Sequence, residues 1–202
     1  MNHFSISLMT VQDYCEYQLY LRCYKGVRAA PTWQMLHGTK KHAQLEERFL
    51  EKAEPLTVPL EEQIRLTLKG LDDAFSVREI RLESKQYKMR GKADEIMVSQ
   101  EAGYVIDDKP RLTEGAKNQV RAYCLAFQEQ FGFEKPLYSV VRDRDSQDIA
   151  WQEPYDDPAQ HHVKKIIARV WDILNGCPGN SSDNPNKCRA CRYRYACDRS
   201  LC

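Results

Sequence analysis

Three carboxylates and one ammonium group follow one another closely in two segments that have the composition of β-strands. Asp94 lies in YKMRGKADEIMVS, and Asp107, Asp108 and Lys109 end the segment GYVIDDKP. Because residues i and i+2 of a strand point to the same face, Asp107 and Lys109 share a face and Asp108 points away from it. A salt bridge is the simplest interpretation of Asp107 and Lys109.

A second interpretation is a divalent-metal site. Two carboxylates that are brought together repel each other unless a cation lies between them. Oxygen ligands suit Mg²⁺ or Mn²⁺, which can polarise a phosphodiester and activate a bound water. Lys109 would then stabilise the charge that develops on the phosphate. The strand segments containing Asp94 and Asp107 therefore predict a site for phosphodiester hydrolysis.

Further candidates lie on two segments with helical periodicity. His42, in GTKKHAQLEERFL, could complete the ligand set, although a lone histidine of this kind is more often a partly buried surface residue. Gln119 and Tyr123 are four residues apart, so they share one helix face and can reach phosphate oxygens together. The alternative for this pair is a polar helix face with a half-buried tyrosine.

The cysteines are distributed unevenly. Of the eight in the chain, five lie in the last 26 residues. Structural disulfides are rare in the cytosol, so clustered thiols favour a bound metal or cluster. The spacing Cys188-x2-Cys191-x5-Cys197 supplies three ligands of an iron–sulfur or zinc site. The fourth ligand is left open among four residues: Cys15, Cys23, Cys177 and Cys202.

Basic and aromatic residues alternate in the same tail. They are Lys187, Arg189, Arg192, Tyr193, Arg194, Tyr195 and Arg199. The net charge of the whole chain is only +1, so any nucleic-acid binding needs a local basic surface such as this one. An alternative function is therefore a non-catalytic nucleic-acid or partner-binding module with a zinc-bound cysteine tail.

The elements that must position these residues follow from periodicity and from capping residues. We expect a helix over 10–25, a second helix between Pro31 and Pro55, and three strands that end at Pro110. A long helix follows from Thr113 to Gly132, and then come two strands and a helix that ends at Gly176. This order predicts a mixed α/β fold with helices packed on a sheet.

Composition limits the class of protein. The chain has 202 residues, of which 42% are hydrophobic, as expected for one domain with a real core. It contains no apolar run of about 18 residues, so no membrane span is expected. The first residues are too polar for a secretory signal, and we expect a cytoplasmic protein.

Taken in order, five motifs carry a family resemblance. They are Gly38-x-x-x-His42, Gly91-x-x-Asp94, Asp107-x-Lys109, Gln119-x-x-x-Tyr123, and the cysteines Cys15, Cys188, Cys191 and Cys197. The sequence resembles the RecB-like exonucleases of the PD-(D/E)XK superfamily that carry an iron–sulfur cluster. Among these it is most similar to the fourth Cas group, the CRISPR-associated exonucleases. The resemblance spans nearly the whole chain.

The resemblance implies a restriction-endonuclease-like α/β fold, a mixed sheet flanked by helices, with three regions. These are an N-terminal helix over 1–30 that supplies one cluster cysteine, a nuclease core over 31–176, and a cysteine-rich region over 177–202. It implies exonuclease action on single-stranded DNA, and trimming of prespacers for the CRISPR integrase complex.

The resemblance also implies roles for individual residues. A [4Fe-4S] cluster would be bound by Cys15, Cys188, Cys191 and Cys197. A Mn²⁺ or Mg²⁺ ion would be held by His42, Asp94, Asp107 and the backbone carbonyl of Asp108. The catalytic residues would be Asp94, Asp107, Lys109, Gln119 and Tyr123, and the DNA contacts would be Arg111, Gln119 and Tyr123.

Overall fold

The computed structural model describes residues 3–202, except for the side chains of residues 34, 35 and 39. Residues 1 and 2 of the predicted region 1–30 lie outside the described part. The division into regions 1–30, 31–176 and 177–202 stays a prediction. No helix within residues 3–202 combines the length and the apolar character needed to cross a bilayer.

The centre of the molecule is a mixed sheet whose strands occur in the spatial order β1-β3-β4-β5-β6, with β2 on the other edge of β3. The strands are β1 (Phe4–Ser5), β2 (Phe75–Ser84), β3 (Met89–Val98), β4 (Gly103–Lys109), β5 (Leu137–Asp143) and β6 (Ile149–Pro154). The meander β2-β3-β4 and the hairpin β5-β6 are antiparallel, whereas β4 and β5 are parallel. The predicted fold class is confirmed: a six-stranded mixed sheet flanked by helices.

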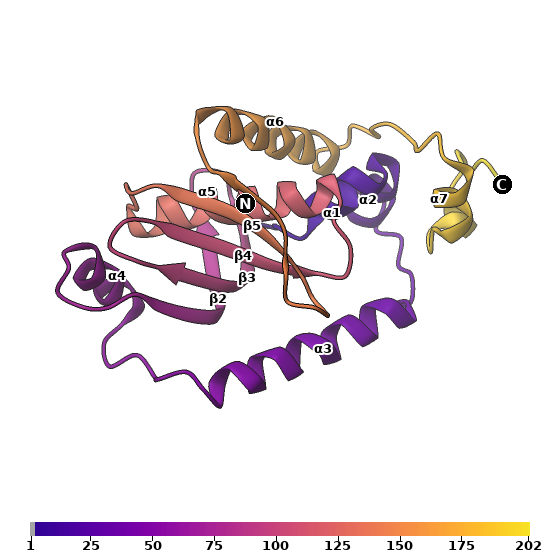
Figure 1. Cartoon of the computed structure of the whole chain (residues 1–202). Helices are drawn as coiled ribbons and strands as arrows, with labels where there is room; N and C mark the ends of the chain where they lie inside the picture. The colour runs from indigo at the N-terminus through magenta and orange to yellow at the C-terminus, as the bar shows by residue number, and fades with distance from the viewer. Residues whose placement is uncertain (1–2) are drawn as a thin grey trace.

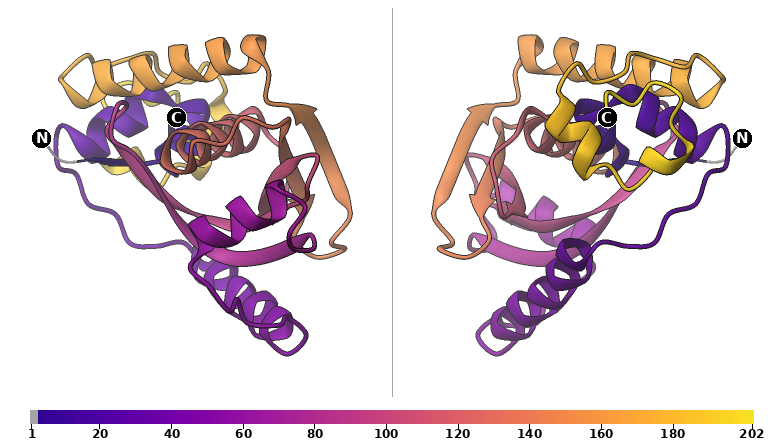
Figure 2. Two further views of the ribbon diagram at one scale, coloured as in Figure 1. Left: turned by 90° about the vertical axis from the view of Figure 1, so that its left-hand side faces the viewer. Right: turned by 90° about the vertical axis from the view of Figure 1, so that its right-hand side faces the viewer.

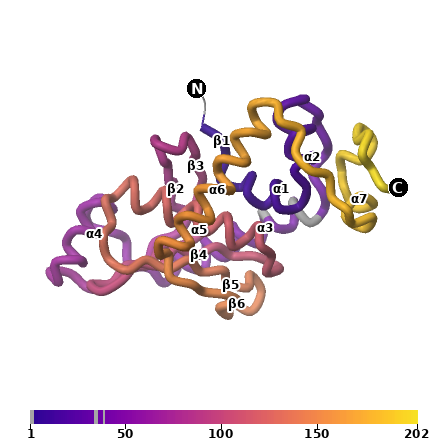
Figure 3. Tube along the Cα trace, turned by 90° about the horizontal axis from the view of Figure 1, so that it is seen from above, coloured from indigo at the N-terminus to yellow at the C-terminus, as the bar shows by residue number. Residues whose placement is uncertain are grey.

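The helices are α1 (Leu8–Tyr14), α2 (Glu16–Cys23), α3 (Trp33–Leu50), α4 (Leu60–Leu68), α5 (Glu114–Phe131), α6 (Asp157–Leu174) and α7 (Pro185–Ala190). A short 3-10 turn follows at Arg194–Ala196. In Figure 2, α5 lies inside the curved sheet with α6 beyond it, and α3 runs along the opposite side of the molecule. The cysteine-rich tail with α7 lies beside α2, far from α4, as Figure 3 shows from above.

Helix α5 connects the parallel strands β4 and β5 and forms much of the core. The Thr113 side chain accepts a hydrogen bond from the Ala116 N–H at 3.1 Å, which caps the first turn. At the other end, Gly132 adopts φ +60°, a left-handed conformation that favours glycine and ends the helix. Both ends agree with the prediction, and the helix fixes Gln119 and Tyr123 against the sheet.

The single helix expected over 10–25 is wrong, because the structure breaks it at Cys15. This residue is extended, with φ −171° and ψ 117°, and it separates α1 from α2. Thr10 lies inside α1 instead of capping it, and its hydroxyl donates to the Ser7 carbonyl at 2.9 Å. The break turns the chain at one of the four predicted cluster ligands.

Strands β3 and β4 pair only along part of their length. Their last paired residues toward Asp94 are Glu95 and Ile106. Continuing the same register would place Asp94 opposite Asp107, but the backbones do not pair there. The two strands therefore separate at the acidic residues, which opens a site at this end of the meander.

Candidate functional site

Three carboxylates form a row across three neighbouring strands. The register of β2 and β3 pairs Arg78 with Glu95 and Ile80 with Ala93, so Glu79 falls opposite Asp94. On the other side of β3, the register with β4 ends at Glu95 and Ile106, and extending it by one residue would bring Asp107 opposite Asp94. Asp107 is not among the side chains whose ligand atoms lie within 4.8 Å of one another. Residues opposite each other on adjacent strands share a face, and like charges in that arrangement are destabilising. The row Glu79–Asp94–Asp107 therefore favours a bound cation.

His42 reaches this row from α3. Its Nδ1 lies 3.4 Å from Oδ1 of Asp94, and this buried nitrogen has no hydrogen-bond partner. One ligand atom each from His42, Glu79 and Asp94 lie within 4.8 Å of one another. Opposite ligands of one Mg²⁺ ion lie about 4.2 Å apart, so only small shifts would let these three atoms share an ion.

Electrostatics in the row also favour a cation. Burial, and then the neighbouring charge of Asp107, raises the pKa of Asp94 well above its usual value. Burial lowers the pKa of His42, and the charges of Arg144 and Lys109 lower it further. A neutral imidazole is the form that binds a metal. The donor set of imidazole and carboxylates thus fits Mg²⁺ or Mn²⁺.

Asp107 pairs with Lys109 on the same face of β4, as the alternation of the strand predicts. The Nζ of Lys109 lies 2.8 Å from Oδ2 of Asp107, and the Asp107 side chain is 2% exposed. The salt-bridge interpretation of this pair is confirmed, and its part in a metal site stays a prediction. The Lys109 ammonium is also close enough to His42 for its charge to lower the pKa of that imidazole.

Gln119 and Tyr123 lie behind Asp107 and are not on the surface. They are 5% and 3% exposed, and Nε2 of Gln119 donates to the Tyr123 hydroxyl at 3.3 Å. Burial and the charge of Asp107 raise the pKa of Tyr123, which keeps the phenol protonated. A Cβ at Gly91 would come within 2.8 Å of Cε1 of Tyr123. The glycine of the second motif thus makes room for the tyrosine of the fourth.

Asp108 connects the two faces of the sheet. Its backbone N–H donates to Oδ2 of Asp94 at 2.6 Å. Its carboxylate is fully buried on the other face, where Nε of Arg142 and Nη2 of Arg78 each contact it at 2.7 Å. Burial alone would raise the pKa of Asp108, but the hydrogen bonds from Arg142 and Arg78 hold it below its usual value. The same two arginines also bind Glu95.

The backbone carbonyl of Asp108, a predicted metal ligand, is in contact with an arginine. Nη2 of Arg144 lies 3.3 Å from this oxygen, and the buried Nε of Arg144 has no hydrogen-bond partner. Arg111, a predicted DNA contact, is exposed just after β4. Gln119 and Tyr123 are the other predicted DNA contacts, and their side chains are buried. Their contacts with DNA stay predictions.

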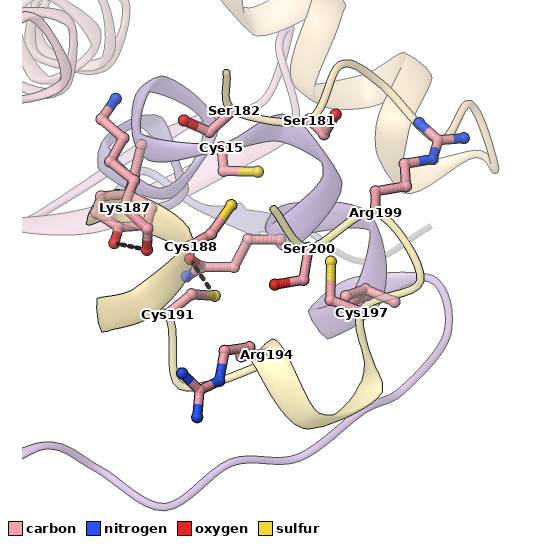
Figure 4. Close-up of a pocket in the computed structure, with 13 residues that line it drawn as sticks. Cys15, Ser181, Ser182, Lys187, Cys188, Cys191, Arg194, Cys197, Arg199 and Ser200 are labelled. Carbon is pink, nitrogen blue, oxygen red and sulfur yellow. Dashed lines mark hydrogen bonds between the residues drawn. The ribbon is translucent and has the colours of Figure 1, made fainter. Parts of the chain in front are cut away.

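Four cysteines line a single cavity between α2 and the tail that contains α7. Figure 4 shows Cys15, Cys188, Cys191 and Cys197 around this cavity. Cys15 comes from the break between α1 and α2, and the other three come from the tail. Sγ of Cys191 also lies 3.4 Å from Oε1 of Gln18. The structure thus gathers the four cysteines that the family resemblance names.

The spacing of the sulfurs can be compared with that of a zinc site. Two thiolates on one tetrahedral zinc ion lie roughly 3.8 Å apart, given a Zn–S bond of about 2.3 Å. Within residues 3–202, no three cysteine sulfurs lie within 4.8 Å of one another. A single zinc ion would therefore require the sulfurs to move closer together. The remaining cysteines are Cys23, Cys177 and Cys202, which are exposed, and Cys124, which is buried.

Sequence reasoning missed two residues of the metal-site candidate. Glu79 is one of many charged residues in SVREIRLES, and only the register of β2 against β3 brings it to Asp94. Arg144 lies in the turn after β5, and its backbone N–H donates to the Lys109 carbonyl at 2.9 Å. No local pattern marks either one, because both depend on pairing between distant segments.

No family model matches the chain. The CRISPR-associated exonuclease Cas4 of Francisella tularensis subsp. novicida is 26% identical over 159 residues, which cover 75% of this chain and 76% of that protein. A solved structure from Eubacterium rectale assigned as an exonuclease has a TM-score of 0.48 at 12% identity, covering 93% of this chain and 87% of its own. The crystal structure of SSO0001 has a TM-score of 0.46 at 16% identity, covering 100% of this chain and 89% of its own. Over three quarters of its length, the chain is thus a sequence homologue of a Cas4 exonuclease.

Proposed function

We propose that this protein is a divalent-metal-dependent DNA exonuclease that acts on single strands. The observation that supports this most is the position of two pairs, His42 with Asp94 and Asp107 with Lys109, on either side of the point where β3 and β4 separate. The chain is a homologue of an exonuclease, and this constellation supplies both metal ligands and a cation for phosphate.

Each residue has a role that follows from its position. A bound Mn²⁺ or Mg²⁺ would supply Lewis acidity and a water of lowered pKa. His42 offers a neutral imidazole, and Asp94 and Asp107 offer carboxylates to that ion. The Lys109 ammonium, held 2.8 Å from Asp107, is placed to stabilise charge on a phosphate oxygen. Gln119 and Tyr123 position Asp107 from behind.

We further propose that the cysteine cavity holds a [4Fe-4S] cluster. Four cysteine thiolates hold such clusters, and Cys15, Cys188, Cys191 and Cys197 line one pocket. All eight cysteines are free, as is expected in a reducing cytoplasm. The cluster would act as a staple between the first helices and the tail.

The biological substrate that we propose is a prespacer, trimmed for the CRISPR integrase complex. This part of the proposal is supported by the homologue alone, which is a CRISPR-associated exonuclease. A pull-down with a purified integrase complex, followed by sizing of the integrated DNA with and without this protein, tests it separately from the chemistry.

The chemistry is tested with single-stranded DNA labelled at one end, incubated with Mn²⁺ or with EDTA. We expect cleavage only with the metal, and a loss of at least about 100-fold in Asp94→Ala and Lys109→Ala. Asp148→Ala, in the β5-β6 turn, and Lys117→Ala, whose ion pair with Glu114 is exposed, serve as matched controls that should cut normally.

Two results would contradict the proposal. Full activity in Asp94→Ala or Lys109→Ala would show that this constellation is not the active site. Binding of DNA without cleavage, by a colourless protein that contains zinc, would instead favour the non-catalytic binding module. An iron–sulfur protein is brown, so the visible spectrum separates the two functions before any assay of cleavage.

A further inference from the structure

We propose that Glu79 is a ligand of the divalent ion, so that His42, Glu79 and Asp94 together form its binding site. This inference rests on the proposed metal-dependent function and adds a residue that none of the sequence motifs contains. It is carried by three observations on β2 and β3: the row of carboxylates, the backbone at Glu79 and the ion pair of Glu79 with Lys92.

The first observation is the position of Glu79 in the row. It lies directly across from Asp94, on the side of β3 away from Asp107. Its side chain is only 13% exposed, so water screens its charge incompletely. Its carboxylate, Asp94 and His42 present ligand atoms within 4.8 Å of one another. Among residues 3–202 this is the one such group of three metal-binding side chains.

The second observation is the backbone of Glu79. It has φ +57° in the interior of a strand, a conformation that residues other than glycine adopt rarely and at an energetic cost. The residues on either side keep the ordinary ladder, so no turn or hairpin requires this conformation. Left-handed residues of this kind cluster at ligand and catalytic sites. With this backbone, a carboxylate oxygen of Glu79 lies within 4.8 Å of ligand atoms of His42 and Asp94.

The third observation is the compensation of charge. Lys92 forms an ion pair with Glu79, and its side chain is 52% exposed. Lys92 is two residues before Asp94 on β3, so it lies on the same face of the strand. Because the Lys92 ammonium is half-exposed, it can leave Glu79 and move into solvent at a low cost in free energy. The structure thus places a removable cation beside the carboxylate where a divalent ion would bind.

The inference is tested by binding of Mn²⁺ in the absence of DNA, measured by calorimetry and by the loss of the free-ion signal in electron paramagnetic resonance. Glu79→Gln keeps the shape of the side chain and removes its charge, and we expect it to weaken Mn²⁺ binding at least tenfold. Glu83→Gln, on the same strand with an exposed carboxylate paired to His3, is the matched control and should bind like the wild type.

Glu79→Gly separates a ligand role from a structural one. Glycine adopts φ +57° without steric cost, so this variant should melt at the same temperature as the wild type or higher. We expect it nonetheless to bind Mn²⁺ at least tenfold more weakly. A purely structural role would give the wild-type affinity in this variant.

The outcomes also distinguish this inference from the proposed function. If wild type binds Mn²⁺ and both Glu79 variants bind it equally well, the inference is overturned and the metal-dependent nuclease stands. If wild type binds no Mn²⁺, both are overturned together.

Discussion

The backbone N–H of Asp108 donates a 2.6 Å hydrogen bond to the carboxylate of Asp94, at a level where β3 and β4 no longer pair. A side chain thus takes over a hydrogen bond that the backbone ladder would otherwise make. The bond fixes Oδ2 of Asp94 and leaves Oδ1 facing His42 at 3.4 Å. The position of the carboxylate that we propose as a metal ligand is therefore set by the backbone of the neighbouring strand.

The buried charges on the opposite face should hold that backbone in place. We expect Asp108→Ala to lower the free energy of unfolding by about 3 kcal/mol, because it leaves Arg78 and Arg142 with Glu95 as the only carboxylate of the network. Urea unfolding measures the change. Glu101→Ala, in the exposed β3-β4 turn, is the control and should change stability by less than about 0.5 kcal/mol. An equal effect of the two substitutions would show that the network adds nothing to stability.

Gly91 and Tyr123 should behave as a coupled pair. A methyl group at position 91 would lie 2.8 Å from Cε1 and 3.0 Å from the hydroxyl of Tyr123. We expect Gly91→Ala to cost about 1–3 kcal/mol by overpacking, and to cost less when Tyr123→Ala is already present. A double-mutant cycle in urea measures the coupling. Strictly additive costs would mean that the glycine is needed for another reason.

The four cysteines of the cavity should act as one unit. We expect Cys15→Ala and Cys191→Ala each to remove most of the iron and the brown colour, and to lower the melting temperature by several degrees or more. Cys23→Ala removes an exposed cysteine from α2 without touching the cavity, and should keep both. Iron and sulfide counting with a melting curve checks all three variants. A cluster retained in Cys15→Ala would remove the N-terminal helix from the ligand set.

Loss of the cluster should loosen the tail. Chelation of iron from the wild-type protein removes the group that we propose between Cys15 and the tail, so the segment over 178–183 should become a site of proteolysis. Gel analysis over time, with the Cys23→Ala protein in parallel, measures this. Equal cleavage rates before and after chelation would show that the tail is held by its protein contacts alone.

A pH-dependent contribution is expected from Glu16 and Arg169, which join α2 to α6. The hydrogen bond from Arg169 lowers the pKa of Glu16 to about 2, with help from the Asn180 N–H. In the unfolded chain the pKa of glutamate is about 4.3. The contribution is therefore complete above about pH 4.3 and is lost as the pH falls toward about 2.

We accordingly expect Glu16→Gln to lower stability at pH 7 by up to about 1 kcal/mol, since solvent screens the pair. The difference from wild type should shrink at pH 3. Urea unfolding at both values measures it, with Glu101→Gln as a control of constant effect. A difference that does not change with pH would exclude Glu16 as the titrating group.

The parts of this protein that sequence reasoning predicted are those set by local signals. The α5 helix has its Thr113 cap and its Gly132 stop in the printed sequence, and the alternation of β4 separates Asp107 from Asp108. The Cys15 break escaped prediction, because YCEYQLYL has helical composition on both sides of it. Its extended backbone places the Cys15 thiol toward tail residues more than 170 positions away in the sequence.

The missed members of the candidate site depend on pairing between distant segments. Glu79 meets Asp94 only through the register of β2 against β3, and a shift of one residue would turn its side chain to the other face. Arg144 meets Asp108 only because β5 lies parallel to β4. Hydrophobic periodicity does not specify which register two strands adopt, because several registers would bury equally apolar faces.

The walls of the cysteine cavity come from two segments that lie far apart in the sequence. Cys15 is made early, but a ribosome must pass Cys197 before the last of the four thiols exists. The sheet and α5 are complete by then, and domains generally fold as they emerge. If the cavity holds the cluster that we propose, its iron would be delivered to a core that is already folded.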